Sequence, residues 1–372
     1  MDVNYKHSIV NVTASLFKHF NISHPHPSLK VIDAALTKKP NHITTILLDG
    51  FGSHLLNKHL KNEDFLNRYH KDTITSVFPS TTAAATTAVL TGLTPYETGY
   101  LGWFQYFKNE DLYYTTFMNE DYYDKTKKIP KGFHDQHFIR ENFVDKIKKE
   151  TAVNGKLFFP FPIDKNGYKD FEDAVNRVVD YQHLHDQTVN YLYITEPDLT
   201  EHKNGTLASE TKRVVNTLNR VIESLALKAP ENSLFLITAD HGLTDVKPLK
   251  LFEYEDIVKT FEHYPTIEPR ATSFHIKEDQ KEVFEQLFNQ YFGEYFTLYR
   301  KEAFLKTNLL GYNEKHPLID YCLGNYFSIA NDQYYFQLDD VKHHNAHHAG
   351  LSDEEMCVPL IIVNSSEVKR HV

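Results

Sequence analysis

Three acidic positions follow apolar runs of the kind that form buried strands. Asp49 follows residues 43–48, Asp198 follows residues 189–195, and the pair Asp240-His241 follows residues 233–239. In an open parallel sheet, the residues beyond the carboxyl ends of the strands gather in a crevice at one edge. One such acid alone is usually a helix cap or a turn residue. Three acids at the same edge indicate a shared site.

The side chains at this edge have the chemistry of metal ligands. Asp198 and His202 are four residues apart, so they would point the same way on a helical turn. Carboxylate and imidazole together suit Zn²⁺, with Mn²⁺ as the alternative if oxygen ligands dominate. A further imidazole could come from the histidine-rich segment 343–348, although a hydrated polar loop is the simpler interpretation for most of it. Two metals about 4 Å apart would clamp both oxygens of a phosphoryl displacement.

The uncharged stretch from Phe78 to Gly92 supplies a candidate nucleophile. Its first residues include the hydroxyl side chains of Ser80, Thr81 and Thr82, which are placed to cap a helix that Gly92 would end. A hydroxyl at a helix N-terminus also lies where free N–H groups favour an anion. The stretch alone favours a plain helix cap. A metal beside it would instead lower the pKa of a threonine hydroxyl and make it a nucleophile.

Short apolar runs alternate with helical patterns along most of the chain. This alternation predicts an α/β fold, a doubly wound and mostly parallel sheet flanked by helices. Residues 252–340 differ in character and predict a small α+β insert. The core is therefore expected to comprise residues 1–251 and 341–372, with a partly irregular, cap-like insertion at about 100–150.

Composition excludes several classes of protein. The 372 residues carry a net charge of -10, which argues against binding to a nucleic-acid polymer. No stretch approaches the roughly 18 apolar residues that span a membrane, and the first residues lack the pattern of a signal peptide. The chain has only two cysteines, Cys322 and Cys357, which argues against a disulfide framework. We expect a cytoplasmic protein whose partner is a small molecule.

Five motifs in order resemble those of the alkaline phosphatase superfamily, and within it the nucleotide pyrophosphatase/phosphodiesterase-like branch. They are Leu48-Asp49-Gly50, Phe78-Pro-Ser-Thr-Thr82, Glu196-Pro-Asp198 with His202 and Gly205, Thr238-Ala-Asp240-His241-Gly242, and His348-Ala-Gly350. Each motif alone is a weak signal. Their shared order and spacing over residues 49–350 make the resemblance strong.

The resemblance implies a two-metal phosphoesterase with Thr82 as nucleophile. Two Zn²⁺ ions, or Mn²⁺, would be held by two sets of ligands: Asp198, His202 and His348 in one, and Asp49, Asp240, His241 and the Thr82 oxygen in the other. His347 is the alternative to His348. The expected reaction is hydrolysis of a phosphodiester or pyrophosphate bond, with a nucleotide-type substrate and a covalent phosphothreonine intermediate.

One position departs from the family pattern. The phosphodiesterase branch usually has an asparagine that donates to a phosphate oxygen, and this chain has Trp103 there, with Gln105 close by. Gln105 or backbone N–H groups could take over this role. Trp103 is expected to form a wall of the substrate pocket or to stack on a nucleobase. Both residues are therefore candidate substrate-binding residues.

Other functions share parts of this pattern. A phosphomonoesterase or a mutase-type phosphotransferase would use the same metal core, and an inactive homologue would bind metal without turnover. A sulfatase is disfavoured, because neither cysteine is followed by the Pro and Arg that its modified residue needs.

Overall fold

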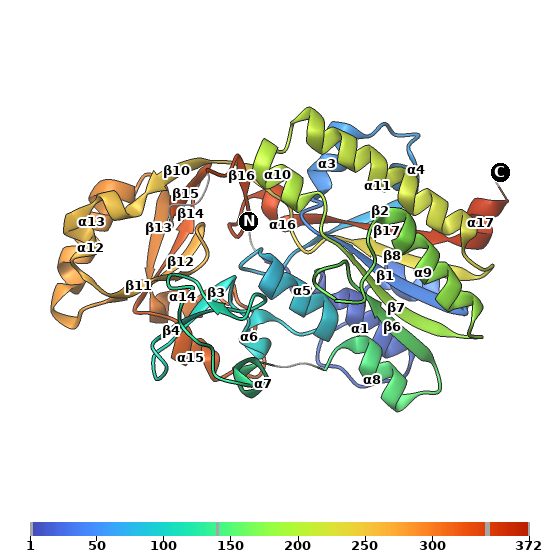
Figure 1. The fold of residues 1–372 in the computed structure, drawn as a ribbon, viewed down its shortest axis with the longest axis horizontal. Coiled ribbons are helices and arrows are strands. Elements are labelled where there is room, and N and C mark those ends of the chain that lie inside the picture. The colour runs from blue at the N-terminus through green and yellow to red at the C-terminus, as the bar shows by residue number, and fades with distance from the viewer. Residues whose placement is uncertain (1–2, 139–140, 339–342, 371–372) are drawn as a thin grey trace.

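The computed structural model describes residues 3–138, 141–338 and 343–370. Its centre is a six-stranded sheet with helices on both faces (Figure 1). In order across the sheet, the strands are β2 (His70–Thr75), β17 (Cys357–Asn364), β8 (Ser233–Thr238), β1 (His42–Leu48), β7 (Thr188–Ile194) and β6 (Asn154–Phe158). The predicted α/β fold class is confirmed.

The middle strands are parallel and end at the same level. Leu48 of β1 lies opposite Ile194 of β7, and Leu47 lies opposite Thr238 of β8. All residues of these three strands are buried, as expected for a parallel sheet covered on both faces. Strand β17 runs antiparallel to both of its neighbours, β8 and β2. The common level of β1, β7 and β8 brings the segments that follow them to one edge.

Helices cover the two faces of the sheet (Figure 1). One face carries α3 (Ser53–His59), α4 (Phe65–Tyr69), α9 (Phe171–His183), α11 (Ser209–Lys228) and α17 (Ser365–Lys369). The other carries α1 (Val10–His19), α2 (Lys30–Leu36), α5 (Thr82–Thr91) and α8 (Phe143–Glu150).

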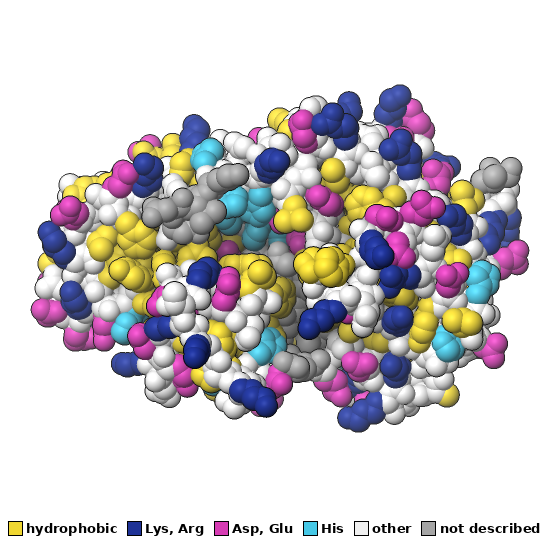
Figure 2. Space-filling view, viewed as in Figure 1, with side chains coloured by type: hydrophobic (Ala, Val, Ile, Leu, Met, Phe, Trp, Pro, Cys, Tyr) yellow, Lys and Arg dark blue, Asp and Glu magenta, His cyan; other side chains and the backbone are white. Residues whose placement is uncertain are grey.

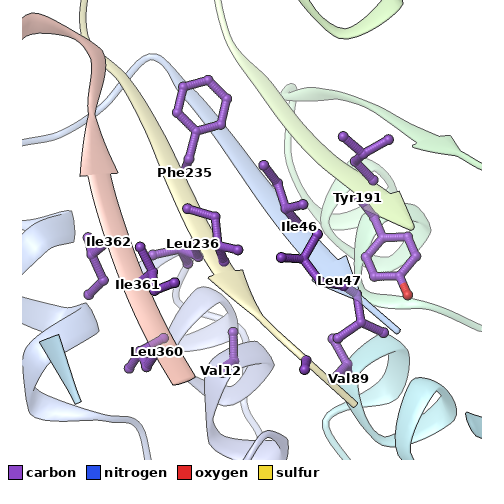
Figure 3. Close-up of a cluster of buried hydrophobic side chains, with 14 of the residues drawn as sticks. Val12, Ile46, Leu47, Val89, Tyr191, Phe235, Leu236, Leu360, Ile361 and Ile362 are labelled. Carbon is purple, nitrogen blue, oxygen red and sulfur yellow. The ribbon is translucent and has the colours of Figure 1, made fainter. Parts of the chain in front are cut away.

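Apolar side chains from the sheet and these helices form the main core. Figure 3 shows Ile46, Leu236 and Ile361 on neighbouring strands, with Val12 of α1 and Val89 of α5 beside them. All five are almost completely buried. Burial of an aliphatic side chain of this size contributes about 1.5–3 kcal/mol to folding. The packing fixes α5, and with it the residue at its start, against the sheet.

A second sheet of seven strands lies to one side of the core (Figure 1). Its order is β13 (Phe296–Arg300), β14 (Tyr326–Ala330), β12 (Ala271–Ile276), β11 (Phe261–Ile267), β3 (Phe104–Phe107), β4 (Leu112–Thr115) and β5 (Glu120–Asp121). Its helices are α7 (Phe133–His137), α12 (Glu255–Val258), α13 (Lys281–Phe292), α14 (Lys301–Lys306) and α15 (Leu318–Cys322).

This second sheet joins two segments that are predicted from the sequence to belong to separate units, residues 100–150 and residues 252–340. Residues 100–150 are expected to be a cap-like insertion of the core, but β3 pairs with β11, where Phe104 lies opposite Ile267. Strands β3, β4 and β5 are only two to four residues long. Such short strands give no readable period of alternation, so their partner could not be inferred from the sequence.

The remaining short elements lie outside the two large sheets. These are α6 (Pro95–Thr98), α10 (Asp198–Asn204), α16 (Asp353–Met356), the pair β9 (Thr244–Asp245) with β16 (Ala346–His347), and the pair β10 (Lys247–Lys250) with β15 (Tyr334–Gln337). Within the described ranges, no helix is long and apolar enough to cross a membrane.

Candidate active site

The ends of β1 and β8 bring Asp49, Asp240 and His241 together. One oxygen or nitrogen atom from each lies within 4.8 Å of those of the other two. His241 Nε2 is 3.5 Å from both Asp49 Oδ1 and Asp240 Oδ2. The backbone N–H of Gly50 donates to Asp240 Oδ1 at 3.1 Å, which links the two strand ends. We call Asp49, Asp240 and His241 the β1–β8 group.

A second group forms where β7 leads into α10. Asp198 and His202 lie one turn apart on this helix, and His202 Nε2 is 3.3 Å from Asp198 Oδ1. His348 comes from the distant loop after β16, and its Nε2 is 3.9 Å from the same oxygen. We call Asp198, His202 and His348 the α10 group. The rings of His348 and His241 stack at a centroid distance of 4.0 Å, so the two groups are adjacent.

Backbone carbonyls orient two of these imidazoles. His202 Nδ1 donates to the carbonyl oxygen of Ala346 at 2.8 Å. His241 Nδ1 lies 3.3 Å from the carbonyl oxygen of Gly242. A proton held at Nδ1 leaves Nε2 as the free lone pair, and this is how metal-binding histidines are usually prepared. In both residues Nε2 points toward the carboxylates.

Burial and neighbouring charges perturb these ionisable groups. Burial raises the pKa of Asp49 well above its usual value, and the nearby Asp240 and Asp198 add to the effect. Burial alone would also raise the pKa of Asp198, but His202 beside it brings the pKa below its usual value. Burial lowers the pKa of His348 well below its ordinary range, with His241 contributing. Strong perturbations concentrated in one place are typical of functional sites.

The two groups fit divalent metal ions. Asp49 and Asp240 are 4% and 0% exposed, and buried carboxylates this close together need a cation nearby. Asp198 Oδ1 and His348 Nδ1 are buried without a hydrogen bond. Each group offers three ligand atoms of carboxylate and imidazole type, the set that Zn²⁺ prefers.

Thr82 is the first residue of α5 and lies beside the β1–β8 group. Its Oγ1 is 3.2 Å from His241 Nε2 and 3.5 Å from Asp49 Oδ1. The helix ends at Gly92, whose φ of 73° fits the expected stop. The expected side-chain cap is absent, because the N-cap residue Thr81 makes no capping hydrogen bond and donates to Glu268 instead.

A cavity of about 300 Å³ opens above Thr82 and the α10 group. It is lined by Thr82, Asp198, Leu199, His202, His344, His347, His348, Glu268, Pro269, Trp103, Phe104, Tyr122, Tyr335, Phe336, Gln337 and Leu338. Figure 2 shows histidine side chains inside a hollow between the two sheets, near the position of α10 and β16 in Figure 1. The cavity therefore has a metal-binding floor and walls that are largely aromatic.

The substrate-binding candidates Trp103 and Gln105 have different environments. Trp103 lines the cavity, as expected for a pocket wall. Gln105 is completely buried, does not line the cavity, and uses its amide on the backbone: its Oε1 accepts from Leu101 N and its Nε2 donates to Gly99 O. Gln105 therefore stabilises the loop before β3. Its amide is already bonded to the backbone, so Gln105 does not replace the asparagine as a donor to a phosphate oxygen.

His348 rather than His347 contributes to the α10 group. The Nδ1 of His347 accepts from the backbone N–H of His348 at 2.9 Å, which turns its ring along the loop. His347 still lines the cavity, so both residues face the same space. The order of the motif alone leaves this choice open.

Several contributors to the site were not found from the sequence. Tyr193 donates its hydroxyl to Asp49 Oδ2. Arg270 and Glu355 form a buried ion pair that supports the loop carrying His348, since Glu355 Oε1 also accepts from Gly350 N at 2.7 Å. Glu268 lines the cavity, and burial raises its pKa to about 7. Each acts across a long sequence separation, and none belongs to a recognisable motif.

Comparison with known proteins decides the family. A family model described as type I phosphodiesterase / nucleotide pyrophosphatase matches residues 44–349. The chain belongs to this family. It is therefore a phosphoric ester hydrolase of the phosphodiesterase type, and the resemblance drawn from the five motifs is confirmed.

Solved structures of this family share the fold. Murine ectonucleotide pyrophosphatase / phosphodiesterase 5, as an inactive threonine-to-alanine variant in complex with AMP, matches with a TM-score of 0.64 and 18% identity over 86% of this chain and 87% of that chain. The human protein matches with a TM-score of 0.64 and 16% identity over 88% and 93%. A comparison with curated protein sequences finds no match.

Proposed function

We propose that this phosphodiesterase hydrolyses a phosphodiester or pyrophosphate bond in a nucleotide-type substrate, with Thr82 as nucleophile and two divalent metal ions as cofactors. The observation that carries the proposal is the position of Thr82 Oγ1, which lies 3.2 Å from His241 Nε2 at the start of α5 and faces the cavity. One ion would be held by Asp198, His202 and His348. The other would be held by Asp49, Asp240, His241 and the Thr82 oxygen.

In the first step, Thr82 Oγ1 would attack phosphorus. The new Oγ1–P bond forms as the bond from phosphorus to the leaving oxygen breaks. This gives a phosphothreonine that still carries the other ester group of the substrate, and it releases an alcohol or phosphate that takes up the proton lost by the hydroxyl. The first N–H groups of α5 have no partners within the helix, and they would be available to the phosphoryl oxygens of a substrate at Thr82. Bound Zn²⁺ or Mn²⁺ would supply charge neutralisation and acidify the threonine hydroxyl.

In the second step, water would hydrolyse the phosphothreonine. A new bond forms between the water oxygen and phosphorus, the Oγ1–P bond breaks, and the Thr82 hydroxyl is restored. The hydrogen bonds of His202 to Ala346 and of His241 to Gly242 hold the imidazoles in place through both steps, because they fix the rotation of each ring.

The walls of the cavity support a substrate with a planar group. Trp103, Tyr122 and Phe336 lie in its lining, and aromatic side chains stack well on nucleobases. The murine relative binds AMP, which is the nucleotide product expected from such a reaction. We propose that a nucleobase or a similar ring occupies the aromatic side of the cavity while the phosphoryl group lies at Thr82.

We also propose a reducing, cytoplasmic environment. Neither cysteine forms a disulfide bond, and Cys322 is buried among apolar side chains. A free buried thiol is common where disulfides do not persist.

Replacement of Thr82 tests the proposal. The wild-type protein, loaded with Zn²⁺ or with Mn²⁺, is expected to hydrolyse bis(p-nitrophenyl) phosphate. Thr82→Ala should lose almost all of this activity, and Thr82→Ser should retain part of it because the hydroxyl remains. Denaturation of the rapidly quenched enzyme, followed by mass spectrometry, should detect Thr82 carrying a phosphoryl group with one p-nitrophenyl ester still attached. Full activity in Thr82→Ala would remove Thr82 from the mechanism.

A further inference from the structure

Glu268 is an acid in the cavity that neither metal group uses. It follows directly after β11, belongs to the insert rather than to the core, and lines the cavity together with Thr82. It is only 2% exposed. Among the described residues, the two sets of candidate metal ligands do not include it. A buried carboxylate beside a phosphoryl site is unfavourable unless it has a function, since its negative charge repels that of the substrate.

One oxygen of Glu268 is fixed by two hydrogen bonds. Thr81 Oγ1 donates to Oε1 at 2.5 Å, and the backbone N–H of Trp103 donates to the same oxygen at 2.7 Å. Thr81 directly precedes the nucleophile, and Trp103 occupies the position where the family pattern has asparagine. Glu268 therefore joins the two segments that would surround a bound phosphoryl group.

The other oxygen faces the cavity. No described residue donates a hydrogen bond to Oε2, and this atom is not among the buried polar atoms that are sealed from solvent. Because Oε1 is held at the wall by Thr81 and Trp103, Oε2 is the part of the side chain that meets a ligand. An ionised carboxylate can only accept hydrogen bonds, so it offers nothing to a phosphoryl oxygen.

We propose that Glu268 is a specificity-determining residue, which disfavours doubly charged phosphomonoesters relative to singly charged phosphodiesters. The inference rests on the proposed function, in which the phosphoryl group lies at Thr82. A diester carries one negative charge, whereas a monoester carries close to two at neutral pH. A fixed charge inside a cavity acts more strongly than one in water, because the surrounding dielectric is lower. The carboxylate of Glu268 therefore repels a monoester, with its second negative charge, more strongly than a diester, which carries only one.

Glu268→Gln separates this role from a structural one. Glutamine keeps an oxygen that accepts from Thr81 and Trp103, and it replaces the charged oxygen with a neutral amide. If Glu268 only holds the two segments together, the substitution should leave substrate preference unchanged. If its charge selects the substrate, preference should move toward monoesters.

The experiment compares two esters with the same leaving group. At about pH 9, where both the carboxyl group and the monoester are ionised, kcat/KM is measured for bis(p-nitrophenyl) phosphate and p-nitrophenyl phosphate with metal-loaded protein. Glu268→Gln should raise the ratio of monoester to diester kcat/KM by about tenfold. Glu262→Gln, an exposed acid on the same strand β11, removes the same charge at a distance and should leave the ratio unchanged.

A binding measurement gives a readout that does not need turnover. In the Thr82→Ala background, calorimetry should show that Glu268→Gln binds inorganic phosphate, a dianion at this pH, about tenfold more tightly. Glu268→Ala is a second neutral variant, and it should shift both measurements in the same direction.

Unchanged ester preference and phosphate affinity in a folded Glu268→Gln protein would overturn the assignment and leave the proposed function intact. Absence of ester hydrolysis by the wild-type protein would instead count against the proposed function, while phosphate binding would still decide the role of Glu268.

Discussion

The buried ion pair between Arg270 and Glu355 provides a direct test of how the second sheet supports the active site. Their side chains are 1% and 0% exposed, and they meet in two parallel contacts of 2.7 and 2.9 Å. Arg270 also donates to the carbonyl oxygens of Asp332 and Tyr334. Arg270→Met keeps most of the side-chain volume and removes all of these donors.

The expected destabilisation is large because the substitution leaves a charge behind. Removing one partner of a buried ion pair costs about 3–5 kcal/mol, and the total stability of a domain is about 5–15 kcal/mol. We therefore expect Arg270→Met to lower the free energy of unfolding by about 4 kcal/mol. The double variant Arg270→Met/Glu355→Gln should lose less than Arg270→Met alone, since its remaining side chain is neutral.

The loss should also depend on pH. Burial alone would raise the pKa of Glu355, but Arg270, together with hydrogen bonds from Ser352 and Gly350, holds it below the usual value. The pair therefore contributes its full stability above the unfolded pKa, and the contribution declines as pH falls through the lowered folded pKa. In Arg270→Met the unpaired carboxyl group should be neutralised at higher pH. The difference between wild type and variant should shrink as the solution becomes more acidic.

Urea unfolding followed by circular dichroism at several pH values measures these differences. Arg213→Met is the control, because Arg213 and Glu210 form an exposed pair on α11 and its loss should cause no measurable change. A loss below about 1 kcal/mol in Arg270→Met, the range of exposed pairs, would refute the reasoning. So would a loss that is the same at every pH.

Three further predictions concern the site itself. Addition of Zn²⁺ to metal-free protein should raise the midpoint of thermal unfolding, because a ligand at a hundredfold excess over its Kd stabilises the folded state by about 2.7 kcal/mol; an unchanged midpoint in calorimetry would contradict the two proposed ion sites. Asp49→Asn should stabilise the metal-free protein at neutral pH. The pKa of Asp49 is raised in the folded state, so at any pH above the unfolded pKa its ionisation lowers the free energy of unfolding, and asparagine removes this cost. Equal or lower stability of the variant in urea unfolding would argue against this burial cost. Trp103→Leu should raise KM for p-nitrophenyl thymidine 5′-phosphate by about tenfold, the value of one aromatic stack, and leave KM for methyl p-nitrophenyl phosphate unchanged; equal effects on both esters would exclude base stacking.

The sequence by itself determined the class of fold and the positions of the chemical groups along the chain. Apolar runs before Asp49, Asp198 and Asp240 are local patterns, and their buried parallel strands follow from hydrophobicity alone. The four-residue spacing of Asp198 and His202 likewise needs only one turn of helix.

Only the tertiary structure decided which other side chains reach the cavity. Glu268 meets Thr81 across 187 positions, and Arg270 meets Glu355 across 85. Gln105 lies in the right segment but turns its amide to the backbone of Leu101, because a completely buried amide must satisfy its hydrogen bonds there. Contacts of this kind depend on how two sheets pack and on which short strands pair. A local pattern carries no information about either, so the metal groups and Trp103 could be anticipated and the other residues of the cavity wall could not.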